Sequence, residues 1–425
     1  MALPATAGAD VMEIRRHPRE IKKALRKSSV PDTFLLGRYS FSPYMACSHG
    51  CTYCDGRAER YWVEGDFARD IVVRTNLVEV LSEELPKLRE RATIVIGSGI
   101  SDAYQPVERE EGLMRRAAEL LARFDLSVSL LTKSALVLRD LDLWRRVNRR
   151  GGFNLYVSLG FARDEPRRIY EPGASSVQER LEALKRFREA GCRTGIMALP
   201  LLPYIGDTEG NLRALLEMAV DAGVDFFMPG GLTLRPGRQK DHFFRVLEEH
   251  DPDLVPRYRE LYAANRQCGS CIRAYRESSS LTAGRITAEY GLPEEIPHEL
   301  YRSRLPLYDE IYVLLSHMII LYGRRGTDTH RLRAALRRYR QWLVERKKVF
   351  NRRRKTTQEE VEEELRLLLG SGGMADVIRN EKLSDFMRRV VVERRLFDYR
   401  RLELTALGSA SAETPWDRSS RLRAP

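Results

Sequence analysis

The feature that most constrains the fold is a regular alternation of short apolar segments and longer amphipathic ones between residues 76 and 228. Helices are predicted at residues 76–91, 107–124, 137–149, 177–190 and 209–222, and strands at 92–96, 126–132, 153–159, 194–199 and 225–228. Because each crossover helix must bury its apolar stripe against the strands, this pattern specifies a parallel sheet. With an extended segment at residues 33–46, about six such units predict an α/β fold, a partial (β/α)6 TIM-like barrel.

The size and composition of the chain fit a globular protein with an appended region. Its 425 residues exceed one ordinary hydrophobic core. Hydrophobic residues make up 43% and charged residues 31% of the chain, and no run of about 18 apolar residues occurs. Residues 1–10 lack the basic and then apolar layout of an export signal. We therefore expect a protein of the reducing cytoplasm with no membrane span.

Three cysteines form the densest chemical motif. Cys47, Cys51 and Cys54 follow a C-x3-C-x2-C spacing, with Gly50 between them. Thiolates on a short loop suit zinc or an iron–sulfur cluster, which in structural sites normally take four protein ligands. A four-iron cubane held by three cysteines leaves one iron open, and an open position indicates a reactive metal. Two alternatives are a zinc site that borrows His49 as fourth ligand and, less favoured for an odd number of thiols, a disulfide.

The sequence of residues 44–57, YMACSHGCTYCDGR, resembles the radical S-adenosylmethionine (SAM) superfamily and, more narrowly, its spore photoproduct lyase-like branch. The resemblance implies that Cys47, Cys51 and Cys54 hold a [4Fe–4S] cluster whose free iron binds SAM. It implies a partial barrel of the radical SAM type. It also implies an electron donor of the flavodoxin or ferredoxin type, because the family cleaves SAM reductively to a 5′-deoxyadenosyl radical.

The ends of the predicted strands carry the candidate cofactor-binding residues. Ligand-binding residues of such barrels lie at the carboxyl ends of strands, where the loops converge. By resemblance, the residues expected to contact SAM are Tyr53, Gly97, Ser98, Gly99, Asp102, Lys133 and Ser158. An ammonium beside a carboxylate and a hydroxyl beside a ribose are natural pairings for Lys133 and Ser158. Each of these residues has the alternative of being an ordinary loop residue.

Two further loops resemble landmarks of the family. Glu171 is expected to orient the loop that contains it rather than to act in catalysis. Arg235 is expected either to bind a substrate phosphate or, as the favoured alternative, to pair with a structural carboxylate.

The other cysteines suggest different roles. Cys192 is expected to be a buried packing residue. Cys268 and Cys271 are either free thiols or an auxiliary metal site that needs further ligands from elsewhere. Spore photoproduct lyase carries a hydrogen-donating cysteine at the end of the strand after its cluster motif. This chain has no cysteine between Cys54 and Cys192, so repair of that lesion by that route is not the favoured reaction.

The net charge of +12 is regional. Residues 324–355 contain 14 Lys and Arg against two acidic residues, while basic and acidic residues balance in the rest of the chain. Leu332, Leu336, Tyr339, Leu343 and Phe350 mark one face of a helix at 329–350. The cations either follow a nucleic-acid backbone, with Tyr339 or Trp342 near bases, or form the solvated face of an amphipathic helix.

Five regions are predicted. They are a basic tail with a helix at 12–27 (1–32), the radical SAM partial barrel (33–251), a barrel-closing segment with the C-x2-C pair (252–300), a mostly helical basic extension with a last helix ending near Phe397 (301–407), and a disordered tail (408–425).

The leading functional hypothesis is a radical SAM enzyme that abstracts hydrogen from nucleic acid in a lyase-like, modification or repair reaction. One alternative keeps the radical chemistry but directs it at a peptide or small metabolite. The other is a non-catalytic, metal-stapled nucleic-acid-binding protein.

Overall fold

The central element is an open, mostly parallel sheet. The structure, a computed structural model, describes residues 13–405 except 89, 91, 98–99 and 353–356. The sheet has the order β10-β9-β8-β7-β6-β3-β2, and every pair in it is parallel except β2 with β3. Its strands are β2 (Arg26–Lys27), β3 (Gly37–Phe41), β6 (Thr93–Ile96), β7 (Ser127–Thr132), β8 (Phe153–Ser158), β9 (Arg193–Leu201) and β10 (Phe226–Gly231). The six parallel strands confirm the predicted partial barrel; β2 is an additional antiparallel edge strand.

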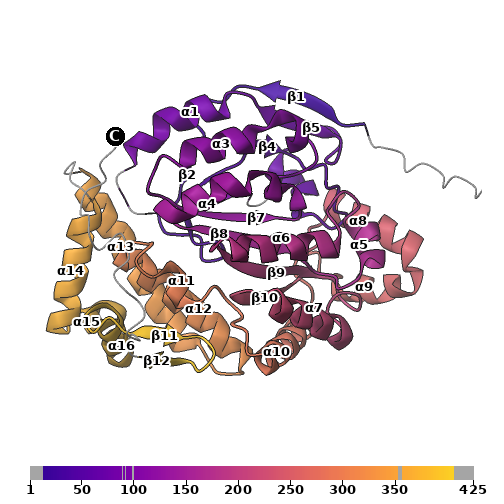
Figure 1. The fold of residues 1–425 in the computed structure, drawn as a ribbon. Helices are drawn as coiled ribbons and strands as arrows, with labels where there is room; N and C mark the ends of the chain where they lie inside the picture. The colour runs from indigo at the N-terminus through magenta and orange to yellow at the C-terminus, as the bar shows by residue number, and fades with distance from the viewer. Residues whose placement is uncertain (1–12, 89, 91, 98–99, 353–356, 406–425) are drawn as a thin grey trace, which may run out of the picture.

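Helices cover the outer face of the sheet (Figure 1). They are α1 (Leu77–Glu84), α3 (Leu113–Leu121), α4 (Leu141–Arg150), α6 (Val177–Glu189) and α7 (Glu209–Asp221), at the positions the sequence predicted. Their apolar stripes pack on outward-facing strand residues such as Ile94, Val128 and Leu155 in one continuous core. The capping box of α6 shows how local sequence fixes a boundary, since Ser176 and Glu179 satisfy each other's backbone amides.

The concave face of the sheet is filled by the C-terminal part of the chain. Inward-facing residues of the strands, such as Val95, Tyr156 and Met228, pack against Leu300 of α11 (His298–Tyr301) and Val313 of α12 (Leu307–Arg324). All five side chains are almost completely buried. The extension is therefore part of the barrel interior and not only an appendage.

The N-terminal region differs from the prediction of a helix at 12–27, which was wrong. Residues Arg15–Arg19 form strand β1, which pairs in parallel with β5 (Asp70–Arg74), and β5 pairs with β4 (Tyr44–Met45). Pro18 disfavours a helix because it lacks an amide hydrogen and restricts His17 to extended geometry. The pair between Arg15 and Asp70, with Nη2 2.6 Å from Oδ2, fixes the strand. This small sheet delivers the chain to Cys47.

The C-terminal extension forms a second hydrophobic core (Figure 1, orange and yellow). Its further helices are α13 (His330–Arg352), α14 (Thr357–Ser371), α15 (Gly373–Ile378) and α16 (Glu381–Val391). The expectation of a helix through Phe397 was wrong, because α16 ends at Val391 and a hairpin follows, β11 (Leu396–Asp398) with β12 (Glu403–Thr405). The predicted tail at 408–425 and residues 1–12 lie outside the described residues.

Two aromatic residues of α13 are not available to nucleic-acid bases. Tyr339 is fully buried and donates a hydrogen bond to the carbonyl oxygen of Tyr308, 2.9 Å away. The ring of Trp342 stacks on that of Tyr339 in the same core. The sequence placed both on a helix correctly, but the role near bases was wrong because they face the α12 side.

A buried ionic cluster joins α13 to the first parallel strand. Asp309 lies 2.8 Å from Nη1 of Arg38 and 2.7 Å from Nζ of Lys347, and the Nη2 of Arg38 lies 3.2 Å from Glu90. These side chains are at most 7% exposed. Lys347, one of the cations of the basic segment, therefore serves the fold.

Replacing Lys347 by methionine should lower the free energy of unfolding by about 3 kcal/mol, because a buried carboxylate loses one of its two partners. The exposed neighbour Lys348 is the matched control, and Lys348→Met should change the free energy of unfolding by less than about 0.5 kcal/mol. Denaturant unfolding of both variants checks this. Equal losses in the two variants would contradict a structural role specific to Lys347.

Within the described residues, none of the helices combines the length and apolarity that crossing a bilayer would require. The domain boundaries at residues 32, 251, 300 and 407 stay predictions.

Candidate active site

A cavity of about 570 Å³ lies at the carboxyl ends of the parallel strands. Its lining includes the predicted residues Cys47, Cys51, Tyr53, Cys54, Gly97, Asp102, Lys133 and Ser158. Ser98 and Gly99 lie outside the described residues. Residues predicted from four separate stretches of sequence thus meet around one space.

The cysteine loop is held from outside by side chains that the sequence analysis did not single out. Arg57 donates from Nε to the carbonyl oxygen of Cys51 and from Nη2 to that of Gly50, both over 2.9 Å. Gln105 accepts from the amide of Ser48 at 2.7 Å. These donors and acceptors satisfy the loop backbone, so its three thiols are left to face the cavity.

The loop also packs closely on a neighbouring loop at Gly173. The amide of Gly173 donates to the carbonyl oxygen of His49 at 2.9 Å. A Cβ atom at this position would come within 2.5 Å of the carbonyl oxygen of Ser48. Only glycine permits this close approach. The contact fixes the position of the cysteine loop relative to the strands.

The three thiols fit a metal centre by their chemistry. They are free, Cys47 and Cys51 are buried, and Cys54 is half-buried. Burial raises the pKa of all three, that of Cys51 to about 12. Such thiols ionise when a nearby positive charge compensates the buried thiolate, which iron provides. In a cubane each thiolate binds a different iron, so the sulfur atoms need not converge on one point.

His49 is not placed as a fourth zinc ligand. Its Nδ1 lies 2.8 Å from the carbonyl oxygen of Gly173, and its Nε2 lies 3.2 Å from Oδ2 of Asp102. In the part of the chain that the structure describes, no three His, Cys, Asp or Glu side chains are arranged to share one metal ion. Because the two ring nitrogens of His49 face Gly173 and Asp102, its geometry does not support the zinc alternative.

Asp102 organises the ends of two strands. Its carboxylate accepts from the hydroxyl of Thr132 at 2.8 Å and from the backbone amides of Lys133 at 2.7 Å and Tyr104 at 2.8 Å. Burial opposes its ionisation, but His49 and the two amides outweigh burial and lower the pKa of Asp102. It is therefore an anion at neutral pH, and its contacts position Lys133 at the cavity wall.

Lys133 contributes a cation to the wall of the cavity. Its ammonium donates to the hydroxyl of Ser158, which in turn donates to the carbonyl oxygen of Leu199 at 2.7 Å. It lies 3.5 Å from Glu171 and 5.8 Å from the centre of the Tyr53 ring. These contacts point it toward the space beside the three cysteines, where a carboxylate of a ligand would meet a positive charge.

Glu171 has the orienting contacts that were expected. It is buried and accepts hydrogen bonds from the hydroxyl of Tyr53 and from Nη2 of Arg180, the latter at 2.7 Å. Burial alone would raise the pKa of Glu171, but the charges of Arg180 and Lys133 and its hydrogen bonds lower it to about 2. This anion links the cysteine loop to α6.

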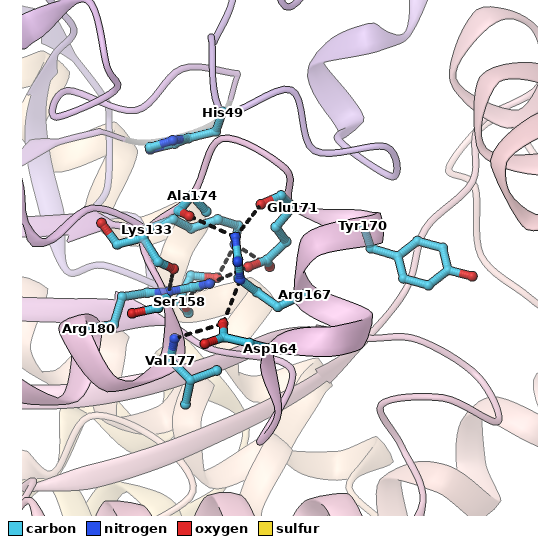
Figure 2. Close-up of polar contacts among 12 residues, drawn as sticks. His49, Lys133, Ser158, Asp164, Arg167, Tyr170, Glu171, Ala174, Val177 and Arg180 are labelled. Carbon is cyan, nitrogen blue, oxygen red and sulfur yellow. Dashed lines mark hydrogen bonds and ion pairs between the residues drawn. The ribbon is translucent and has the colours of Figure 1, made fainter. Parts of the chain in front are cut away.

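Figure 2 shows how two arginines hold the loop around Glu171. Arg180 donates from Nη1 to the carbonyl oxygen of Ser158 at 2.7 Å. Arg167 pairs with Asp164 at 2.7 Å and donates to the carbonyl oxygen of Ala174 at 3.0 Å. The sequence did not indicate these roles. Arg180 lies on a predicted helix, where arginines normally face solvent, and no helix was predicted around Arg167, which lies in α5 (Asp164–Tyr170).

The remaining candidates have structural surroundings. Arg235 pairs with Asp55, with Nε 2.6 Å from Oδ1, which confirms the structural alternative. Cys192 is buried in the main core, as expected. Cys268 is exposed and Cys271 is buried, and no auxiliary metal site appears around them among the described residues.

Comparisons with known proteins agree with this site. The family model of the radical SAM superfamily matches residues 41–233. An uncharacterized protein of Mycobacterium tuberculosis H37Rv is 34% identical over 278 residues, which cover 64% of this chain and 79% of that protein. Spore photoproduct lyase of Clostridium acetobutylicum is 26% identical over 193 residues, covering 43% of this chain and 52% of the lyase.

A solved structure of a spore photoproduct lyase mutant with bound AdoMet and dinucleoside spore photoproduct is 19% identical. It matches with a TM-score of 0.42 over 56% of this chain and 66% of that chain, just under two thirds of its length. The chain belongs to the radical SAM superfamily, an enzyme family that uses a [4Fe–4S] cluster and SAM, and spore photoproduct lyase is among its relatives.

Proposed function

We propose that Cys47, Cys51 and Cys54 ligate the [4Fe–4S] cluster and that SAM binds beside it in the same cavity. The observation that carries the proposal is the meeting of three free thiols with Lys133, Ser158 and Asp102 around one space of about 570 Å³. When bound, the cluster supplies the electron that cleaves SAM reductively and yields a 5′-deoxyadenosyl radical. Because oxygen destroys such clusters, the reducing cytoplasm and a flavodoxin or ferredoxin type donor suit this chemistry.

The residues around the cavity have different roles in binding SAM. Lys133 offers an ammonium to the carboxylate of SAM, and Ser158 offers a hydroxyl to the ribose. Tyr53, held by Glu171, and Gly97, whose positive φ of 76° brings the backbone close to the cavity, shape the wall. Asp102 keeps Lys133 in place through its backbone amide. Together these contacts orient the bound ligand.

We infer further that the substrate is nucleic acid. Support comes from the relative named spore photoproduct lyase and from α13, where Arg333, Arg337 and Arg340 are exposed on one helical face. The alternative of a peptide or small metabolite retains the same cofactor site. Membership of an enzyme superfamily favours both over a non-catalytic protein.

Anaerobic reconstitution tests the proposal. The protein should gain about four irons and four sulfides per chain and, with SAM and dithionite, release 5′-deoxyadenosine. Adding single-stranded DNA should increase the rate of release, because a bound substrate provides the hydrogen atom. Failure to form 5′-deoxyadenosine would refute the cofactor part. Formation that DNA leaves unchanged would refute the nucleic-acid part only.

A further inference from the structure

A second cavity of about 180 Å³ lies next to the candidate active site. It is formed by the end of β10, the segment that follows, and α10 (Arg273–Glu289). Gly231, Leu232 and Thr233 line both cavities. A substrate bound over the larger cavity can therefore extend a neighbouring group into the smaller one.

One face of α10 supplies most of the polar wall. Arg276, Ser279, Ser280 and Ala283 follow a spacing of three, four and seven residues, so their side chains share one face of the helix. The hydroxyl groups of Thr233 and Ser270 and the ring of Tyr262 also line the space. The wall thus combines hydrogen-bond donors with a few flat apolar surfaces.

The charges of this cavity favour an anion. Two of the charged side chains that line it are arginines, Arg276 and Arg324, and one is an aspartate, Asp207. Arg324 is fixed by Glu295 at 3.1 Å and by the carbonyl oxygen of Pro229 at 3.0 Å. Arg276 is exposed, and none of the described carboxylates forms an ion pair with it.

The carboxylate of Asp207 forms hydrogen bonds with the residues around the cavity. Asp207 accepts from the hydroxyl of Tyr275 at 2.7 Å, from that of Ser279 at 3.3 Å and from the amide of Tyr204 at 2.7 Å. With these acceptor positions used, Asp207 holds α10 against the loop after β9. Among the described residues, no carboxylate therefore compensates the charge of Arg276, which shares the cavity wall with Ser280.

We propose that this second cavity binds a phosphate group of the substrate, with the guanidinium of Arg276 as the main contact. A guanidinium matches two phosphate oxygens at once, and hydroxyl groups supply the additional donors. The inference rests on the proposed function and deepens it, because it places the phosphodiester next to the reacting nucleotide at the end of β10.

Two probes distinguish the sources of phosphate. Octathymidylate carries phosphodiesters of a strand, and thymidine 5′-monophosphate carries the phosphate of a small molecule. Binding is measured by fluorescence anisotropy and by competition on the reconstituted protein. Arg276→Gln should weaken octathymidylate binding about tenfold and reduce the slope of log affinity against log salt concentration by about one. Arg273→Gln is the matched control, since Arg273 is 76% exposed on the same helix and pairs with Glu277; its affinity should equal that of the wild type.

Release of 5′-deoxyadenosine with dithionite, measured on the same preparations, separates this inference from the proposed function. Without DNA, this release should equal the wild-type level in the control variant Arg273→Gln. If only thymidine monophosphate binding falls, the phosphate site stands and the strand is not its source. If Arg276→Gln binds both probes as the wild type does, the phosphate site is refuted, whether or not the protein cleaves SAM. Failure of the wild type to bind either probe refutes it as well.

Discussion

Replacing Cys51 by alanine should reduce the formation of 5′-deoxyadenosine by about a thousandfold or more, and the same holds for Cys47 and Cys54. A cluster held by three thiolates has no spare protein ligand, so loss of one removes the centre rather than weakening it. Iron and sulfide content, together with the yield of 5′-deoxyadenosine from SAM and dithionite, measure the effect.

Two other cysteines provide matched controls for this experiment. Cys268 is exposed, so Cys268→Ala should retain iron and activity. Cys192 is packed in the main core, so Cys192→Ala should retain the cluster but lose about 1 kcal/mol of stability. Full iron content and activity in Cys51→Ala would exclude the thiol from the centre. Loss in Cys268→Ala would instead indicate a second cluster.

Glu171→Gln should destabilise the protein at neutral pH by about 3 kcal/mol, because it removes a buried anion from between two cations. The carboxylate is 1% exposed and lies 2.7 Å from Arg180 and 3.5 Å from Lys133. Glutamine keeps the shape and loses the charge. Arg180 is then buried beside a neutral group, and Tyr53 loses its charged acceptor.

The pH dependence identifies this mechanism. In the folded protein the pKa of Glu171 is lowered to about 2, whereas an unfolded glutamate titrates near 4.5. The ionised form is thus favoured by folding, so its contribution is complete above pH about 4.5 and is lost as the pH falls toward 2. The difference in unfolding free energy between wild type and Glu171→Gln should therefore shrink over that interval.

Urea unfolding of the apoprotein at pH 7 and at pH 3 measures the difference. Glu182→Gln is the control, since Glu182 is exposed on the same helix as Arg180, and it should change stability by less than about 0.5 kcal/mol. A loss for Glu171→Gln that is the same at both pH values would show that shape or hydrogen bonding, and not charge, is responsible.

Much of the fold was predictable because the local periodicity of its apolar residues indicates the helices and strands. The outer helices bury one stripe each and the strands are short apolar runs, so α3, α6 and β7 appear at the predicted places. Strands β1 and β12 were missed because they carry no such pattern. The residues of β1 are all exposed, and pairing with β5 makes it a strand.

The candidate site was predictable where a motif or a strand end marked it, as at Cys47, Lys133 and Ser158. The residues that hold the site in place from outside were not predictable. Arg57 and Arg180 look like surface arginines in the sequence, and only the tertiary fold turns them toward buried carbonyl and carboxylate oxygens. Lys347 shows the same error, since a residue of the basic segment, expected at the surface, pairs with the buried carboxylate of Asp309.

Leu300 and Val313 cover the concave face of the sheet, and they are synthesised after the strands that they cover. Strands β3 to β10 leave the ribosome long before the residues that cover them. The nascent chain therefore exposes a hydrophobic groove until α12 has emerged. A gene trimmed to end at residue 233, where the matched family region ends, would never close that groove, and its product should collect in inclusion bodies.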